Sequence, residues 1–229
     1  MKKKLLSRIF AGVLGIFGLA ILIAIAVPLA NYQRISSQKY PKLLSPIPDK
    51  GGSTLGEESD LTKASNWFVG GAKSGDFTSS SVSFYTISIP KLKIDSASVA
   101  IGGEDLSKSL IHYPGTALPG QKGNAVIFGH SVLPLFFDSK DYLKIFSTLP
   151  NLNKGDEILV NYDGVSYKYR VETMQEILPT DLQVLDQDKS DSFLTLVTCV
   201  PPGDPRKPFR LIVRARIVPL AQTNANTWN

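Results

Sequence analysis

The chain's only cysteine closes the stretch Leu194-Thr195-Leu196-Val197-Thr198-Cys199, a run of β-forming residues. Turn-forming residues follow at once in Pro201-Pro202-Gly203, and a second β-rich run covers residues 209–218. A strand that ends in a lone thiol, next to a loop and a strand bearing arginines, is an arrangement suited to nucleophilic catalysis. A lone cysteine is also often a small core residue, so this stretch alone leaves both interpretations open.

From residue 82 onward the chain alternates short β-rich segments with turns. Segments bounded by Gly or Pro predict strands at 83–89, 94–101, 124–130, 156–162, 166–173, 194–199 and 209–218. Asp163-Gly164 lies between two of them and is a strong hairpin signal. Short helices are predicted at 104–111 and 141–146. Seven or eight such strands predict a mainly β domain, a barrel or a sandwich, over 82–218, followed by a polar tail at 219–229.

The N-terminal segment has the layout of a membrane anchor. Residues 1–8 contain four basic side chains, and residues 9–30 form an uncharged apolar run. A helix of about 20 apolar residues spans a bilayer, whereas the apolar core of a secretory signal has only ~7–15. The basic residues favour a cytoplasmic N-terminus. We therefore expect a single-pass anchor in the cell membrane with the rest of the chain extracytoplasmic; cleavage near Ala24-Ile25-Ala26 and a buried soluble helix are the alternatives.

Residues 31–81 are rich in Pro, Gly and Ser and predict a flexible extracytoplasmic linker. Such a spacer would hold the following domain well clear of the lipid headgroups. Trp67-Phe68 is an isolated apolar pair within it, which would dock either on the domain or on the membrane surface.

The overall composition excludes some classes of protein. The net charge of +5 is modest and several basic residues sit at the extreme N-terminus, so it gives little support to nucleic-acid binding. One cysteine cannot form an internal disulfide. The two histidines are His112 and His130. A pairing of Cys199 as nucleophile with His130 as acid/base is the functional hypothesis, and a hydrogen-bonded structural histidine is the alternative.

Four arginines follow the cysteine within 17 residues: Arg206, Arg210, Arg214 and Arg216. On a strand beginning near Phe209, Arg210 and Arg214 point to one face and the apolar residues between them to the other. An arginine beside a thiol can stabilise a thiolate or the oxyanion of an acyl-transfer intermediate. A solvated surface charge is the alternative, and we favour it for Arg214 and Arg216.

The stretch that ends in Cys199 resembles the Thr-Leu-x-Thr-Cys signature of sortases, the membrane-anchored cysteine transpeptidases. Other segments resemble sortase motifs in the same order along the chain: 85–92, 112–120 with 123–124, 127–130, 179–186 and 209–214. The resemblance covers about 82–218, and an N-terminal anchor followed by a spacer is also typical of the family.

The resemblance implies a closed sortase-like β-barrel and a role for each of four residues. Cys199 would attack the threonine carbonyl of a Leu-Pro-x-Thr-Gly-like sorting signal and form a thioacyl-enzyme. His130 would be the general acid/base, Arg210 would hold the oxyanion or the substrate backbone, and Thr198 would help to position the substrate. The partners implied are surface proteins with a C-terminal sorting signal and an amine nucleophile from a cell-wall precursor or another protein.

Some features depart from subclasses of the family. Ser131 follows the histidine where several subclasses have arginine. Residues 113–124 contain no acidic side chain, so no calcium site is predicted, and no other metal or cofactor is implied. We see neither the lid segment of the pilin-polymerising class nor a second span. The apolar, aromatic-rich stretch 131–146 predicts either part of a substrate groove or simple packing.

Two other functions remain open from the sequence. One is a membrane-anchored thiol peptidase that only hydrolyses its substrate. The other is an anchored binding module without catalysis, in which Cys199 would be dispensable.

Overall fold

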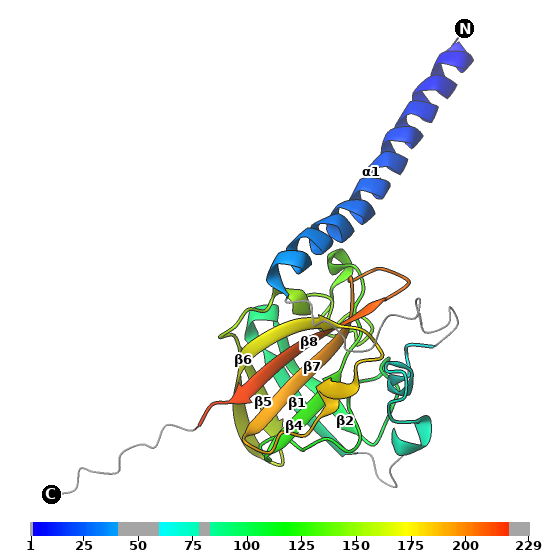
Figure 1. Ribbon diagram of the computed structural model, residues 1–229. Coiled ribbons are helices and arrows are strands. Elements are labelled where there is room, and N and C mark those ends of the chain that lie inside the picture. The colour runs from blue at the N-terminus through cyan, green and yellow to red at the C-terminus, as the bar shows by residue number, and fades with distance from the viewer. Residues whose placement is uncertain (1, 41–59, 78–82, 220–229) are drawn as a thin grey trace, which may run out of the picture.

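The computed structural model describes residues 2–40, 60–77 and 83–219, in which eight strands close into a barrel and one long helix projects from it (Figure 1). This confirms the predicted mainly β barrel. The elements are α1 (Lys2–Lys39), β1 (Ser83–Ile89), β2 (Ile94–Ile101), β3 (Leu110–His112), β4 (Gly123–Phe128), β5 (Glu157–Tyr162), β6 (Val165–Ile177), β7 (Ser192–Val200) and β8 (Phe209–Ile217), with short 3-10 turns between them.

The strand order around the barrel is β1-β2-β3-β4-β7-β8-β6-β5, and β5 pairs with β1 to close it. The pairs β2–β3 and β4–β7 are parallel and the others are antiparallel. Parallel pairing sets Phe128 at the end of β4 beside Val197 near the end of β7. The ends of β4 and β7 and the start of β8 therefore meet at one end of the barrel.

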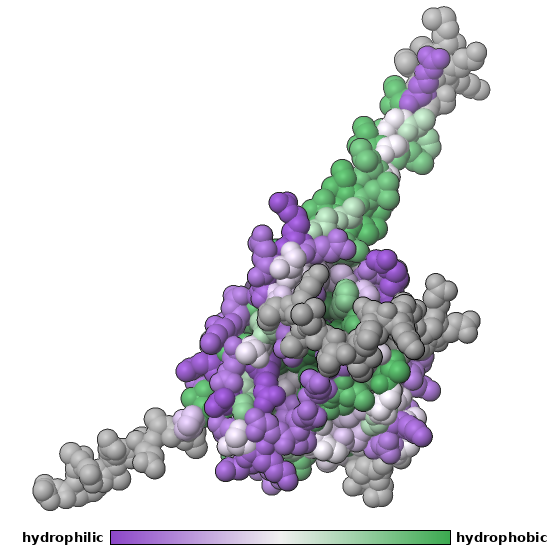
Figure 2. Space-filling model, viewed as in Figure 1, coloured by the Kyte–Doolittle hydropathy of each residue, from purple (hydrophilic) through white to green (hydrophobic). Residues whose placement is uncertain are grey.

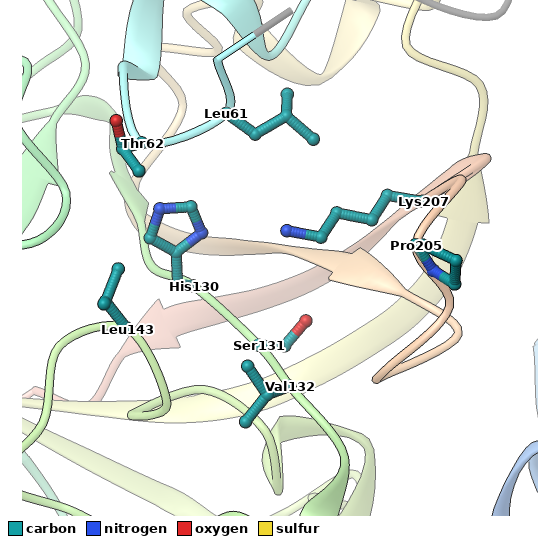
Figure 3. Close-up of a pocket in the computed structure, with 8 residues that line it drawn as sticks. All are labelled: Leu61, Thr62, His130, Ser131, Val132, Leu143, Pro205 and Lys207. Atoms are coloured by element: carbon teal, nitrogen blue, oxygen red, sulfur yellow. The ribbon is translucent and has the colours of Figure 1, made fainter. Parts of the chain in front are cut away.

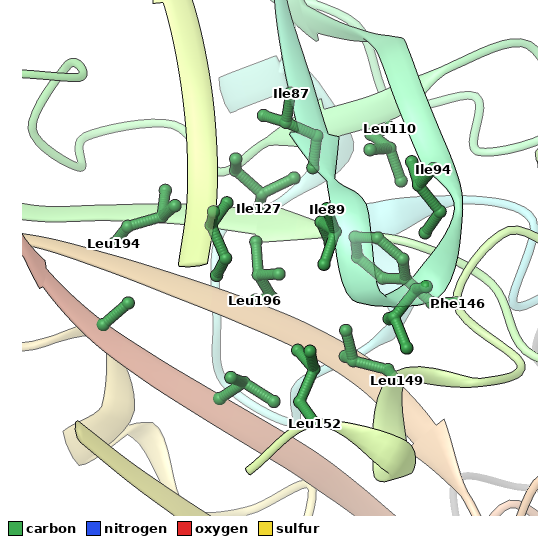
Figure 4. Close-up of a cluster of buried hydrophobic side chains, with 14 of the residues drawn as sticks. Ile87, Ile89, Ile94, Leu110, Ile127, Phe146, Leu149, Leu152, Leu194 and Leu196 are labelled. Atoms are coloured by element: carbon green, nitrogen blue, oxygen red, sulfur yellow. The ribbon is translucent and has the colours of Figure 1, made fainter. Parts of the chain in front are cut away.

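Strand β7 is buried on both of its faces, which explains its continuous apolar sequence. Leu194, Leu196 and Val200 point into the barrel and belong to its inner cluster (Figure 4). Val197 and Cys199 point outward into a second cluster that lies between the barrel wall and the segments covering it.

The seven predicted strands are all present, with β6 extending to Ile177, beyond its predicted end. The strand missed by the sequence is β3. It has three residues and exists because it pairs with β2 on one side and β4 on the other, a signal that local sequence does not carry.

The two predicted short helices are wrong. Within 104–111, Leu106 donates its backbone N–H to Thr62 and the last two residues join β3, so pairing with distant segments overrides local propensity. Residues 141–146 form successive turns instead, closed by bonds such as Lys144 N to Asp141 O at 2.9 Å.

The structure differs from the predicted linker over 31–81 in two described stretches. In the first, α1 continues to Lys39 and its end caps the barrel. The Lys39 ammonium donates to the carbonyls of Pro150 and Leu152 at 2.7 and 2.6 Å, and Tyr40 is buried in the inner cluster. The Tyr32 hydroxyl donates to the carboxylate of Glu176 on β6. The end of the helix therefore packs directly on the barrel.

In the second stretch, residues 60–77 pack on the outside of the barrel; we call them the covering segment. Trp67, Phe68 and Phe77 are all buried in the outer cluster. The sequence left two docking surfaces open for Trp67-Phe68, the domain or the membrane. In the structure the pair packs on the domain. Residues 41–59 and 78–81 of the predicted linker, and 220–229 of the predicted tail, lie outside the described residues.

Among the described residues, one helix is long and apolar enough to cross a membrane, over Arg8–Lys39. Its apolar surface stands out from the mixed, largely polar surface of the barrel (Figure 2). The helix contains Pro28 without interruption.

Candidate active site

Cys199 and Arg210 are directly opposite each other on β7 and β8. Because residues opposite one another in an antiparallel pair point to the same face, both side chains lie on the outer wall of the barrel. Both are fully buried, with 0% exposure. Arg210 and Arg214 share one face of β8, as the alternation of side chains along the strand predicts.

His130 is held beside Cys199 by the residues around it. The Gly129 N–H donates to the carbonyl of Val197 at 3.1 Å, and the Thr198 hydroxyl donates to the carbonyl of Gly129 at 2.7 Å. The Ser131 hydroxyl donates to the carbonyl of Cys199 at 2.5 Å. The residues on both sides of His130 are thus tied to residues 197–199.

Gly129 is required where the chain leaves β4. A Cβ atom at this position would lie 2.5 Å from side-chain carbons of both Leu110 and Phe146. Non-bonded carbon atoms normally lie about 3.5–4.0 Å apart. A larger residue at position 129 would therefore displace the backbone that carries His130.

The guanidinium of Arg210 is bonded to backbone carbonyls rather than to a carboxylate. Its Nε donates to Trp67 at 3.1 Å, and one terminal nitrogen donates to Lys207 at 3.0 Å and to Phe209 at 3.2 Å. The other terminal nitrogen, Nη2, has no partner among the described residues. A buried, unpaired donor beside a thiol is a position where an oxyanion would be stabilised.

The covering segment closes this site through Trp67. The indole ring stacks on Phe128 with the centroids 5.1 Å apart, lies 5.6 Å from the His130 ring, and lies 5.6 Å from the Arg210 guanidinium. The sequence showed no segment that we identified as a lid, yet these residues cover Cys199 from solvent. Trp67 is the residue at the site that sequence reasoning missed, and its only signal was an apolar pair inside a polar spacer.

A cavity of about 350 Å³ opens beside His130 (Figure 3). Leu61 and Thr62 of the covering segment lie on one side, and Lys207 from the loop between β7 and β8 points toward the imidazole from another. The remaining lining residues are Ser131, Val132, Leu143 and Pro205. The cavity gives His130 a path to solvent while Cys199 stays covered.

Burial and, to a lesser degree, the positive charge of Lys207 together lower the pKa of His130 from 6.5 to about 4, against a weaker opposite effect of Asp60 and Asp105. Its Nε2 is buried and has no partner among the described residues. In the covered structure His130 is therefore neutral at pH 7 and has one nitrogen free for proton transfer.

His112 is a structural residue and lies apart from Cys199, on β3. Its Nδ1 bonds the Tyr85 hydroxyl at 2.9 Å and its Nε2 the Thr116 hydroxyl at 3.1 Å. Burial also lowers its pKa to about 4. The two histidines are equally buried, and only their partners distinguish them.

The other arginines are engaged elsewhere. Arg214 lies 4.0 Å from the centroid of the Phe193 ring and 3.6 Å from Asp188. Arg216 pairs with Glu172 at 2.7 Å, and the exposed Arg206 pairs with Asp204 at 2.8 Å. Thr198 points into the barrel and bonds the Gly129 carbonyl, so its hydroxyl holds the loop of His130 and does not face Cys199. The part of the chain that the structure describes has no cluster of three or more potential metal ligands.

The mixed eight-stranded barrel and the outward position of its cysteine define a sortase-like class of protein. Residues 87–218, more than half of the chain, match the family model for the sortase domain. The chain belongs to the sortase family.

Curated relatives and solved structures agree with this assignment. Sortase A of Streptococcus agalactiae is 28% identical over 132 residues, which are 57% of this chain and 51% of the relative. Sortase A of Bacillus anthracis is 29% identical over 126 residues, 54% of this chain and 55% of the relative. The chain thus spans about half the length of these relatives. The structure of a lid mutant of sortase A from Corynebacterium diphtheriae has a TM-score of 0.52 and 31% identity, covering 62% of this chain and 74% of that one.

Removal of the Trp67 side chain should expose the thiol. Trp→Ala substitutions in packed positions cost about 3–5 kcal/mol, so Trp67→Ala should raise the rate of Cys199 alkylation by a maleimide about tenfold or more. Phe77→Ala is the matched control, because Phe77 packs in the same cluster but on Tyr113, away from the site. Equal acceleration by both variants would contradict a specific cover at Trp67.

Acid should destabilise the covered structure. The pKa of His130 is 6.5 when exposed and about 4 here, so the unfolded chain binds more protons between these values. Stability therefore falls as the pH drops from 6.5 to 4, by about 1.4 kcal/mol for each pKa unit. His112 contributes equally. His130→Gln should remove about half of this pH dependence, measured as the urea midpoint of unfolding; an unchanged slope would contradict the assignment.

Proposed function

We propose that the chain is a membrane-anchored cysteine transpeptidase that cleaves a Leu-Pro-x-Thr-Gly-like sorting signal and transfers the acyl part to an amine on the cell surface. The observation that carries this proposal is the gathering of Cys199, His130 and Arg210 at one end of the barrel. Membership of the sortase family supports it.

In the acylation step, the Cys199 thiol gives its proton to the neutral His130, which becomes the imidazolium, and the Cys199 sulfur attacks the threonine carbonyl carbon of the signal. The carbonyl oxygen becomes an oxyanion, for which the free Nη2 of Arg210 is a donor. As the tetrahedral intermediate collapses, the carbon–nitrogen bond breaks and the departing amine takes a proton from the His130 imidazolium. The products are a thioester on Cys199 and the released glycine-side peptide.

In the second step, an amine attacks the thioester and His130 takes up the proton that the amine loses. The carbon–sulfur bond breaks, the thiolate leaves, and a new amide links the surface protein to the amine. The cavity beside His130 is the approach that the covered structure leaves for this nucleophile. An amine from a cell-wall precursor or from another protein would serve equally in this chemistry.

The covering segment must move before a peptide can bind. The carbonyl of Trp67 accepts a hydrogen bond from the Nε of Arg210, and the Trp67 ring lies against His130. A substrate backbone would replace these contacts. The covered structure is therefore the resting form in this proposal. Thr198 would act in it by positioning the loop of His130, and not by contacting substrate as first expected.

The proposed topology follows from the helix that is able to span a bilayer. The basic residues before it favour a cytoplasmic N-terminus, which leaves the barrel outside the cell membrane, where surface proteins and cell-wall amines are found.

Peptide cleavage with and without an added amine tests the proposal. The full chain in detergent should release the glycine-side fragment of a Leu-Pro-x-Thr-Gly peptide and form an amide product only when an amine such as triglycine is present. Hydrolysis without any amide product would favour the thiol peptidase. Retained cleavage by the Cys199→Ala variant would show that Cys199 is not the nucleophile, and absence of cleavage by the parental chain would favour the binding module.

Arg210→Ala should lower turnover far more than Arg214→Ala. Loss of one oxyanion donor costs about 10²–10³ in kcat, whereas Arg214 contacts Phe193 and Asp188 at a partly exposed site. Because Arg210 is fully buried, each rate should be divided by the folded fraction, measured by circular dichroism. Equal losses in the two variants would show that Arg210 has no special part in the reaction.

A further inference from the structure

The anchor helix joins the barrel at the same end as the candidate active site. Tyr32 of α1 bonds Glu176 of β6, which is opposite Leu211 of β8, and Leu211 is opposite Thr198 of β7. The attachment point is thus two strands from the residue beside Cys199. The inference that follows rests on the membrane anchor of the proposed function.

The same end of the barrel must lie close to the lipid. The apolar run ends at residue 30, while α1 continues unbroken to Lys39. Tyr32, which bonds Glu176 of the barrel, is two residues beyond the run, and at a rise of about 1.5 Å per residue this is roughly 3 Å along the helix. The headgroup layer on one side of a bilayer is about 5–8 Å thick, so this end of the barrel lies at the depth of the headgroups.

Exposed apolar side chains lie on the loop 131–146, which leaves the barrel at this end. Leu135 is 70% exposed and Phe136 is 56% exposed, side by side in a short 3-10 turn. The next residue, Phe137, packs against the inner cluster, as does Tyr32. In Figure 1 this loop lies beside the foot of α1.

We infer that the catalytic end of the barrel docks on the bilayer that holds α1, with Leu135 and Phe136 inserted at the boundary between headgroups and acyl chains. Adjacent exposed apolar residues at a loop tip are costly in water and stable at that boundary. Arg34 on α1 is exposed, and a basic residue at this depth attracts anionic headgroups; the charges of the loop itself, Asp138, Lys140, Asp141 and Lys144, balance one another. The occupant of the apolar tip is therefore lipid.

This docking would set where substrates reach the enzyme. Val132 and Leu143 of the same loop line the cavity beside His130, so the cavity would open along the membrane surface. A peptide or amine that is itself held by the bilayer would arrive at the height of His130 without leaving the surface.

A depth measurement on the full chain tests the docking. In a Cys199→Ala background, Phe136→Cys is labelled with a polarity-sensitive fluorophore and reconstituted in vesicles of phosphatidylcholine and phosphatidylglycerol that contain spin-labelled lipids as quenchers. Val165→Cys is the matched control: Val165 is an exposed apolar residue at the opposite end of β6 from Glu176, roughly 35 Å away. We expect a blue-shifted emission and at least about twofold stronger quenching at 136 than at 165.

Equal quenching at the two positions would overturn the inference. A blue shift at 136 that grows with the protein-to-lipid ratio would overturn it too, since that dependence indicates contact between copies of the protein. A Leu135→Asp/Phe136→Asp variant, made in the chain that retains Cys199, should cleave soluble peptide in detergent at the parental rate. A large loss there would assign the tip to the substrate groove and overturn the docking. Absence of cleavage by the parental chain would count against the transpeptidase and leave the depth result standing.

Discussion

The buried guanidinium of Arg210 is the constraint on which the rest of the site depends. Removing a charge from water costs several kcal/mol even after relaxation, and here backbone carbonyls and the Trp67 ring replace the water. One of these carbonyls, that of Phe209, belongs to β8, that of Lys207 belongs to the loop before it, and that of Trp67 belongs to the covering segment. The same arginine therefore attaches the cover in the resting form and, through its unpaired Nη2, keeps a place for an anion when the cover leaves.

The sequence predicted the elements whose signals are local. Strands with clear alternation or turn boundaries were found, and the lone cysteine, the histidine after an apolar strand and the arginine spacing led to Cys199, His130 and Arg210. What it could not predict depends on distant partners. Strand β3 exists through its neighbours alone, and the burial of Trp67 requires a surface made by β4 and β8 that is invisible in the composition of a spacer.

Access to Cys199 is limited on two sides by different physical means. On the outer wall, packing of the covering segment excludes water. At the end of the barrel, the inferred contact with lipid confines the approach to the membrane surface. His130 lies between the two, buried enough for its pKa to fall to about 4 but reached by a cavity. Release of the cover would rehydrate the imidazole and return its pKa toward 6.5, so that opening and proton transfer are linked.

The packing of the end of α1 on the barrel has a consequence for any soluble form of the protein. Tyr40 is buried in the inner cluster and Tyr32 packs against it, while the Lys39 ammonium donates to the carbonyls of Pro150 and Leu152. A truncation placed after the helix would uncover apolar side chains and leave those carbonyls to water. The last helical turns thus close one end of the barrel's core, and a soluble form that keeps these contacts begins at Asn31 rather than at the first strand.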